Sequence, residues 1–177
     1  MKKLMFALML VSCALGGGGA AAQQPSPPAA AAYAEDGASI ESLVAATYAV
    51  ISGPAGQARD WDRFRALFVD GAFMVPRAVG AGGLRRVTPE EYIARSGPVL
   101  ERDGFFETET ARSVRRYGDI AQVFSIYEAR RAPGDAKPLF GGINAFQLVY
   151  DGQRWRIASL VWQQAGEGLP IPKEYGG

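Results

Sequence analysis

The chain contains no histidine and only one cysteine, and these two shortages remove several classes of site. Without histidine there is no Ser-His-Asp triad, no Cys-His pair and no histidine-ligated metal. The single cysteine, Cys13, excludes an internal disulfide framework and a thiolate zinc site. The sequence also lacks a glycine-rich phosphate loop of the dinucleotide or Walker type. We therefore expect no metal and no cofactor.

An excess of charge of one sign is lacking as well. The 19 basic and 18 acidic residues leave a formal net charge of +1. Nucleic-acid-binding domains usually carry a clear basic excess, so we expect no nucleic-acid partner. The chain has 177 residues, of which 48% are hydrophobic, and this length and composition suit one globular domain.

Long hydrophobic runs are absent, but a short one stands near the N-terminus. Lys2 and Lys3 precede it, and Gly16–Gly19 follow it, so it falls short of the ~20 residues of a membrane-spanning helix. Small residues then lead up to Ala22, as at a signal-peptidase site. We predict a signal peptide over residues 1–22, cleaved after Ala22, and export to the periplasm or the medium.

An envelope lipoprotein is the alternative interpretation of the same leader. Residues 10–13 read Leu-Val-Ser-Cys, which resembles a bacterial lipobox whose cysteine carries the lipid. A membrane is then a partner only through a lipid on Cys13. In either case residues 23–38, rich in proline and alanine, are predicted to form a linker, and residues 39–177 the folded domain.

The domain begins with helical patterns and continues with strand patterns. Ser39 is expected to cap a helix with an apolar stripe that ends before Gly53, and Asp60 a second helix that carries Leu67 and Phe68 on its apolar face. Thr88, followed by Pro89 and Glu91, starts a third helix. Alternating residues predict a strand over Ala72–Arg77, after the second helix, and four later strands at Phe106–Tyr117, Ile120–Arg130, Gly142–Tyr150 and Trp155–Gln163.

This order of elements resembles the nuclear-transport-factor-2-like superfamily, which includes ketosteroid isomerase and the SnoaL-like cyclases. The residues that carry the resemblance are the second-helix set Asp62, Leu67, Phe68 and Ala72, the hairpin sequence Phe146–Ile157 and the tail Pro170–Tyr175. The resemblance implies an α+β fold: a cone-shaped, curved antiparallel sheet closed by three N-terminal helices, as in a cystatin-like roll. It also implies a pocket inside the cone, and dimers formed through the sheet face.

The Asp151-Gly152 turn predicts which side chains of the last two strands face the pocket. With a two-residue loop Asn144 pairs with Ser159, Phe146 with Ile157, and Leu148 with Trp155. A four-residue loop shifts these pairs but keeps the same residues on each face. Leu160 and Trp162 then fall on the opposite face. This mostly apolar inner face with a few polar groups is typical of a small-molecule site. The pocket candidates are Tyr92, Arg112, Tyr127, Asn144, Phe146, Trp155 and Ser159.

Three strand carboxylates, Glu107, Glu109 and Glu128, are the candidates for acid–base chemistry. The simpler interpretation, which we adopt here, places them in solvent beside arginines. The alternation puts Arg112 on the face opposite to Glu107 and Glu109, where it either binds an anionic ligand in the pocket or pairs with Glu128. Tyr48, Tyr92 and Tyr127 are candidate hydroxyl donors. No acid occurs in Ala72–Arg77, which departs from the isomerase pattern.

Three functional hypotheses follow from these observations. The first is an exported binding domain whose cone holds a small, largely apolar molecule. The second is an isomerase, cyclase or dehydratase that uses a buried glutamate or tyrosine. The third is an accessory or assembly protein that forms a homodimer through the sheet face.

Overall fold

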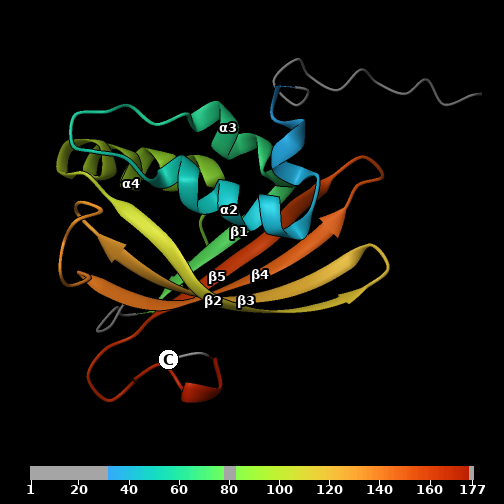
Figure 1. Ribbon diagram of the computed structural model, residues 1–177. Helices are drawn as coiled ribbons and strands as arrows, with labels where there is room; N and C mark the ends of the chain where they lie inside the picture. Colours follow the sequence, from blue (N-terminus) through green and yellow to red (C-terminus); the bar gives the residue numbers. More distant parts are fainter. Residues whose placement is uncertain (1–31, 78–82, 176–177) are drawn as a thin grey trace, which may run out of the picture.

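The computed structural model describes residues 32–77 and 83–175, and the predicted leader, Cys13 and most of the predicted linker lie outside these residues. Three α-helices and five strands make up the described domain, together with two short 3-10 helices (Figure 1). In chain order the elements are η1 (Ala34–Gly37), α2 (Ile40–Ile51), α3 (Trp61–Ala66), β1 (Phe68–Arg77), α4 (Pro89–Asp103), β2 (Phe106–Tyr117), β3 (Ile120–Arg130), β4 (Phe140–Tyr150), β5 (Trp155–Gln164) and η2 (Lys173–Tyr175).

The strands form one curved sheet in the order β1-β5-β4-β3-β2, and the three helices lie together on one of its faces (Figure 1). Strands β2 to β5 are antiparallel neighbours, as predicted, whereas β1 joins β5 in parallel and makes the sheet mixed. The α+β class is confirmed. The side chains between the helices and the sheet form the hydrophobic core.

All three predicted N-caps are present. The side chains of Ser39, Asp60 and Thr88 accept hydrogen bonds from backbone N–H groups in the first turns of α2, α3 and α4. Helix α4 continues past Pro98 to Asp103.

The end of α3 differs from the prediction. Leu67 and Phe68 leave the helix, and β1 begins at Phe68 instead of Ala72. The cause is a tertiary contact, because the carbonyl of Leu67 accepts a hydrogen bond from Ile157 N at 2.8 Å. Pairing with β5 therefore replaces the further helical turn that the periodicity suggested.

A buried arginine joins the ends of the two long helices. Arg59 is 7% exposed, and its guanidinium donates hydrogen bonds to the carbonyl oxygens of Ile51 (3.1 Å), Gly53 (2.6 Å) and Leu100 (3.0 Å). Buried charge is tolerated where every donor finds an acceptor. Because Ile51 and Leu100 come from α2 and α4, Arg59 fixes the distance between these helices at one end of the cone.

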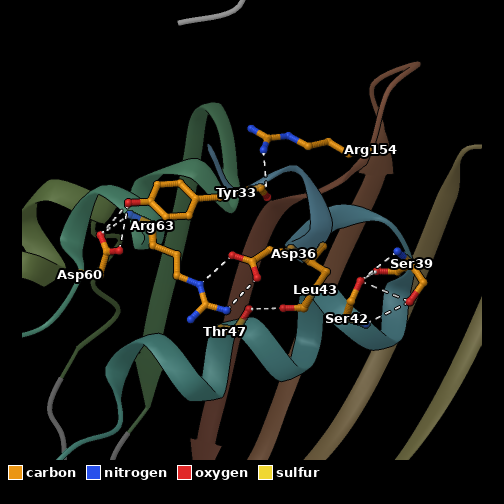
Figure 2. A network of polar contacts seen from close by, with 9 residues as sticks. All are labelled: Tyr33, Asp36, Ser39, Ser42, Leu43, Thr47, Asp60, Arg63 and Arg154. Carbon is orange, nitrogen blue, oxygen red and sulfur yellow. Dashed lines mark hydrogen bonds and ion pairs between the residues drawn. The ribbon is translucent and has the colours of Figure 1, made fainter. Parts of the chain in front are cut away.

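The segment before α2 is attached to the domain by polar contacts (Figure 2). The Tyr33 hydroxyl donates to Asp60, and Arg63 forms two hydrogen bonds of 2.7 Å with Asp36. On the same side, Arg154 donates to the carbonyl oxygen of Tyr33. Among the described residues, contacts with the domain therefore extend back to Tyr33, upstream of the predicted start at residue 39.

Two β-bulges change which side chains face the helices. In β2, Glu109 pairs with Tyr127 and Ala111 with Ile126, so Thr110 is the extra residue. The shift moves Arg112, opposite Ser125, onto the inner face with Glu109. Our expectation that Arg112 and Glu109 lie on opposite faces is therefore wrong, while Arg112 is on the inner face as a pocket candidate should be.

The second bulge corrects the predicted hairpin register. The loop has four residues, because Tyr150 pairs with Trp155, and Ala158 is then an extra residue. After the bulge, Asn144 pairs with Trp162 instead of Ser159, and Phe146 pairs with Leu160. Ser159 lies opposite Gln147, on the face turned away from the helices. Leu160 and Trp162 take its place on the inner face.

The outer face of the sheet carries the end of the chain, which runs below the strands in Figure 1. There the Tyr175 ring stacks on Phe124 with a centroid distance of 5.9 Å. The predicted homodimer through the sheet face stays a prediction. In the described part of the chain, no helix has both the length and the apolar character needed to cross a membrane.

Candidate functional site

A cavity of about 210 Å³ lies inside the cone, between the helices and the inner face of the sheet. Most of its lining residues are apolar and come from all three helices, from β1, β4 and β5, and from the residue before β2: Ile51, Phe64, Met74, Leu100, Phe105, Phe140, Leu160 and Trp162. Its polar lining residues are Thr47, Tyr92, Ser96, Glu107, Tyr127 and Asn144. A few polar groups in an apolar hollow orient a small ligand.

Glu107 is the only carboxylate among these lining residues. Burial raises its pKa to about 7, and a hydrogen bond of 3.1 Å from Asn144 Nδ2 to Glu107 Oε1 acts in the opposite direction. The expectation of a solvated strand charge is therefore wrong for Glu107. A carboxyl with a pKa near 7 exists in both protonation states at neutral pH, which suits it to accept a proton and to return it.

Two tyrosines line the cavity together with Glu107. Burial raises the pKa values of Tyr92 and Tyr127, and the negative charge of Glu107 contributes in the same direction at both. Their hydroxyls are therefore neutral and able to donate a hydrogen bond. Tyr127 can occupy its position because residue 142 is a glycine: a Cβ there would lie 2.7 Å from the Tyr127 hydroxyl oxygen.

A chain of hydrogen bonds leads from the cavity to an ion pair on the same sheet face. Asn144 Nδ2 lies 3.1 Å from the Tyr48 hydroxyl, which lies 2.5 Å from Ser125 Oγ. Ser125 Oγ lies 2.5 Å from Glu109 Oε1, and Glu109 Oε2 forms an ion pair of 2.5 Å with Arg112. We call this chain, from Asn144 to Arg112, the relay.

The ion pair gives the relay a direction. A carboxylate only accepts, so Ser125 donates its proton to Glu109, and Tyr48 must then donate to Ser125. The Tyr48 oxygen accepts from Asn144, which leaves the second N–H of Asn144 for Glu107. Glu109 and Arg112 therefore decide which side of the Asn144 amide faces Glu107, although neither lines the cavity.

Of the predicted pocket residues, Tyr92, Tyr127 and Asn144 line the cavity. Phe146 and Trp155 are buried in the hydrophobic core on the inner face, without lining the cavity. Ser159 is excluded from it by the Ala158 bulge, and Arg112 is engaged by Glu109.

The other candidate groups have partners elsewhere. Glu128 forms an ion pair of 2.6 Å with Arg130, as its expected place beside arginines suggested, and not with Arg112. Tyr48 is a member of the relay and does not line the cavity.

Sequence reasoning missed Leu160, Trp162 and Ser96 as cavity residues. Leu160 and Trp162 reach the inner face only because of the Ala158 bulge, and an alternating sequence pattern does not indicate such a bulge. A signal for Ser96 was present, because it lies one helical turn after Tyr92 and therefore on the same face of α4. Among the described residues, no three side chains of the metal-ligating types come together as a metal site.

Comparison with solved structures identifies the fold. A protein from Kribbella flavida matches with a TM-score of 0.57 and 18% identity, over 73% of this chain and 93% of its own. A Nostoc punctiforme protein of unknown function with a cystatin-like fold matches with a TM-score of 0.56 and 14% identity, over 75% and 92%. An NTF-2-like protein of unknown function from Silicibacter pomeroyi matches with a TM-score of 0.51 and 20% identity, over 71% and 92%.

No protein-family model and no curated protein sequence matches the chain. The structural matches show that the chain has the nuclear-transport-factor-2-like, or cystatin-like, fold. The resemblance stated from the sequence is thereby confirmed at the level of the fold. Because this fold carries many functions, the function has to be argued from the cavity.

Proposed function

We propose that the cone binds a small, largely apolar molecule and that Glu107 transfers a proton to or from it. The observation that carries this proposal is a single carboxyl, with a pKa of about 7, among apolar lining residues. Structural carboxylates at a sheet surface rarely occupy such a place, whereas general acids and bases commonly do.

The residues around Glu107 have distinct roles in this proposal. The Glu107 carboxylate removes a proton from a carbon next to a carbonyl group, and the negative charge moves to the carbonyl oxygen. The hydroxyl of Tyr127 or Tyr92 donates a hydrogen bond to that oxygen. The protonated Glu107 then returns the proton to another carbon, as an isomerase does, or to a leaving hydroxyl, as a dehydratase does. Asn144 holds Glu107 in place throughout.

A probe that needs only a base tests this proposal. Removal of the carbon-bound proton of 5-nitrobenzisoxazole breaks its ring N–O bond and releases a coloured phenolate. We expect turnover to rise with pH with a midpoint near 7, and Glu107→Gln to lower kcat/KM at least ~100-fold.

Glu128→Gln is the matched control, because it changes a glutamate of the neighbouring strand that pairs with Arg130 outside the cavity. It should leave turnover unchanged. Equal turnover by Glu107→Gln and the unaltered protein would contradict the proton-transfer role. Binding of the probe without turnover would leave a binding domain, which is the first of the hypotheses drawn from the sequence.

Export is a separate proposal that rests on the leader sequence alone. We propose that the chain is exported and processed after Ala22. Mass measurement of the mature N-terminus tests it, since a lipid on Cys13 would give a different mass and starting residue. Cys13→Ser would release the protein from the membrane only in the lipoprotein alternative.

A further inference from the structure

A second hollow of about 140 Å³ lies beside the cavity and shares three lining residues with it: Tyr92, Ser96 and Trp162. Arg85, from the segment before α4, and Arg95, from α4 itself, supply its charge. We call this second hollow the arginine annex. The shared residues form the boundary between the two spaces, with the Tyr92 and Trp162 rings edge to face at a centroid distance of 6.2 Å.

The two arginines of the annex are not neutralised by an ion pair. Within residues 32–77 and 83–175, neither has an acidic oxygen within 4.0 Å, whereas Arg63, Arg65 and Arg112 are all paired. Exposed arginines without an acidic partner leave donors available for an anion.

Glu91 is the carboxylate that faces both arginines. Hydrogen bonds from Thr88 lower the pKa of Glu91 most, and the charges of Arg85 and Arg95 lower it further, so both guanidinium groups act on this carboxylate. However, Glu91 Oε2 accepts hydrogen bonds from the backbone N (2.7 Å) and the hydroxyl (3.2 Å) of Thr88 in the capping box. It is thus held at the start of α4 and leaves the annex positive.

The cavity and the annex offer opposite chemistry. The cavity has no cationic lining residue and contains Glu107, so an anionic group placed there would meet repulsion and an apolar wall. The annex, next to it, has two arginines and a small volume. A ligand that fills both must be apolar at one end and anionic at the other.

We propose that the arginine annex binds the carboxylate of an amphipathic ligand whose apolar body occupies the cavity. The proposal names the substrate class of the site proposed above and rests on that function. The carboxylate lies between Arg85 and Arg95, and the body passes Ser96 toward Glu107.

Two probes of the same shape and different charge test the proposal: 2-naphthoate and its neutral amide, 2-naphthamide. In a fluorescence titration at low salt we expect naphthoate to bind roughly fivefold more tightly than naphthamide, since exposed charge pairs contribute modestly. High salt should remove the difference. The double variant Arg85→Gln/Arg95→Gln should lower the affinity for naphthoate to that for naphthamide and leave the affinity for naphthamide unchanged.

The control variant Arg115→Gln/Lys173→Gln removes two positive charges from exposed residues remote from the annex and should change neither affinity. Equal affinities of the two probes in the unaltered protein would overturn the proposal. An equal loss of affinity for both probes in Arg85→Gln/Arg95→Gln would also overturn it. Failure of the proposed function looks different: naphthamide, which reports on the cavity alone, would not bind, and nitrobenzisoxazole turnover would not depend on Glu107.

Discussion

Glu107 and Glu109 lie two residues apart on one strand and on the same face, but their surroundings differ. Glu107 lines an apolar cavity and receives a hydrogen bond from a neutral amide. Glu109 forms an ion pair with Arg112 and accepts from Ser125. The first carboxyl therefore titrates near neutrality, and the second serves as the fixed negative end of the relay. The comparison shows how one strand supplies both a reactive group and its support.

The difference has a physical logic. A reactive carboxyl needs an environment that disfavours its charge, and this environment costs stability. An anchoring carboxylate needs a partner that keeps it charged and in place. The Thr110 bulge makes both possible, because it turns Arg112 toward Glu109 while Glu107, before the bulge, has no ion pair with any described residue.

The largest expected effect comes from removing the charge of Glu107. Its folded pKa of about 7 lies above the ordinary carboxyl value of 4.5, so the folded state is most stable while Glu107 is protonated. This contribution is lost as the pH rises from about 4.5 to 7. At pH 8, Glu107→Gln should therefore be more stable than the unaltered protein by up to about 3 kcal/mol.

Urea unfolding at pH 4.5 and pH 8 measures this difference. The gain should be close to zero at pH 4.5, where Glu107 is protonated in the folded state and only half ionised in the unfolded state. Glu128→Gln should change stability by less than about 0.5 kcal/mol at either pH. A constant effect of Glu107→Gln at both pH values would mean that the cavity does not disfavour the charge.

The next effect tests the anchored end of the relay. Arg112→Leu leaves the Glu109 carboxylate on the inner face without its counter-ion and should cost about 2 kcal/mol of unfolding free energy at pH 7. Arg115→Leu is the matched control on the same strand, because its side chain is exposed. If both variants lost the same stability, the ion pair would have no special role.

The smallest effect links the two carboxyls. Glu109→Gln removes the fixed acceptor, so the relay can reverse and Asn144 can turn its amide oxygen toward Glu107. That oxygen favours the protonated carboxyl, and the pKa of Glu107 should rise by roughly one unit. The midpoint of the ¹³C shift of labelled Glu107 reports it. An unchanged midpoint would show that Asn144 is oriented without the relay.

Local rules predicted the framework of the molecule. The caps at Ser39, Asp60 and Thr88 depend on residues close in sequence, and all three are present. These features need no knowledge of distant partners, which is why a single sequence sufficed for them.

The cavity itself depended on contacts between distant residues. The bulges at Thr110 and Ala158 each add one residue to a strand, and no residue type in the sequence predicts their positions. Each reverses the facing of everything beyond it, so Arg112 and Trp162 turned inward and Ser159 outward. The relay also joins α2 to three strands, so all its members except Ser125 could be named as candidates but not connected.

The most direct test of the account is the titration of Glu107 in the protein with ¹³C-labelled glutamate, with Glu107→Gln to assign its signal. We expect a midpoint near pH 7 for Glu107, clearly above the midpoints of the exposed glutamates. A midpoint near pH 4.5 would contradict it, because Glu107 would then be a solvated strand charge and the cavity would have no group to transfer a proton.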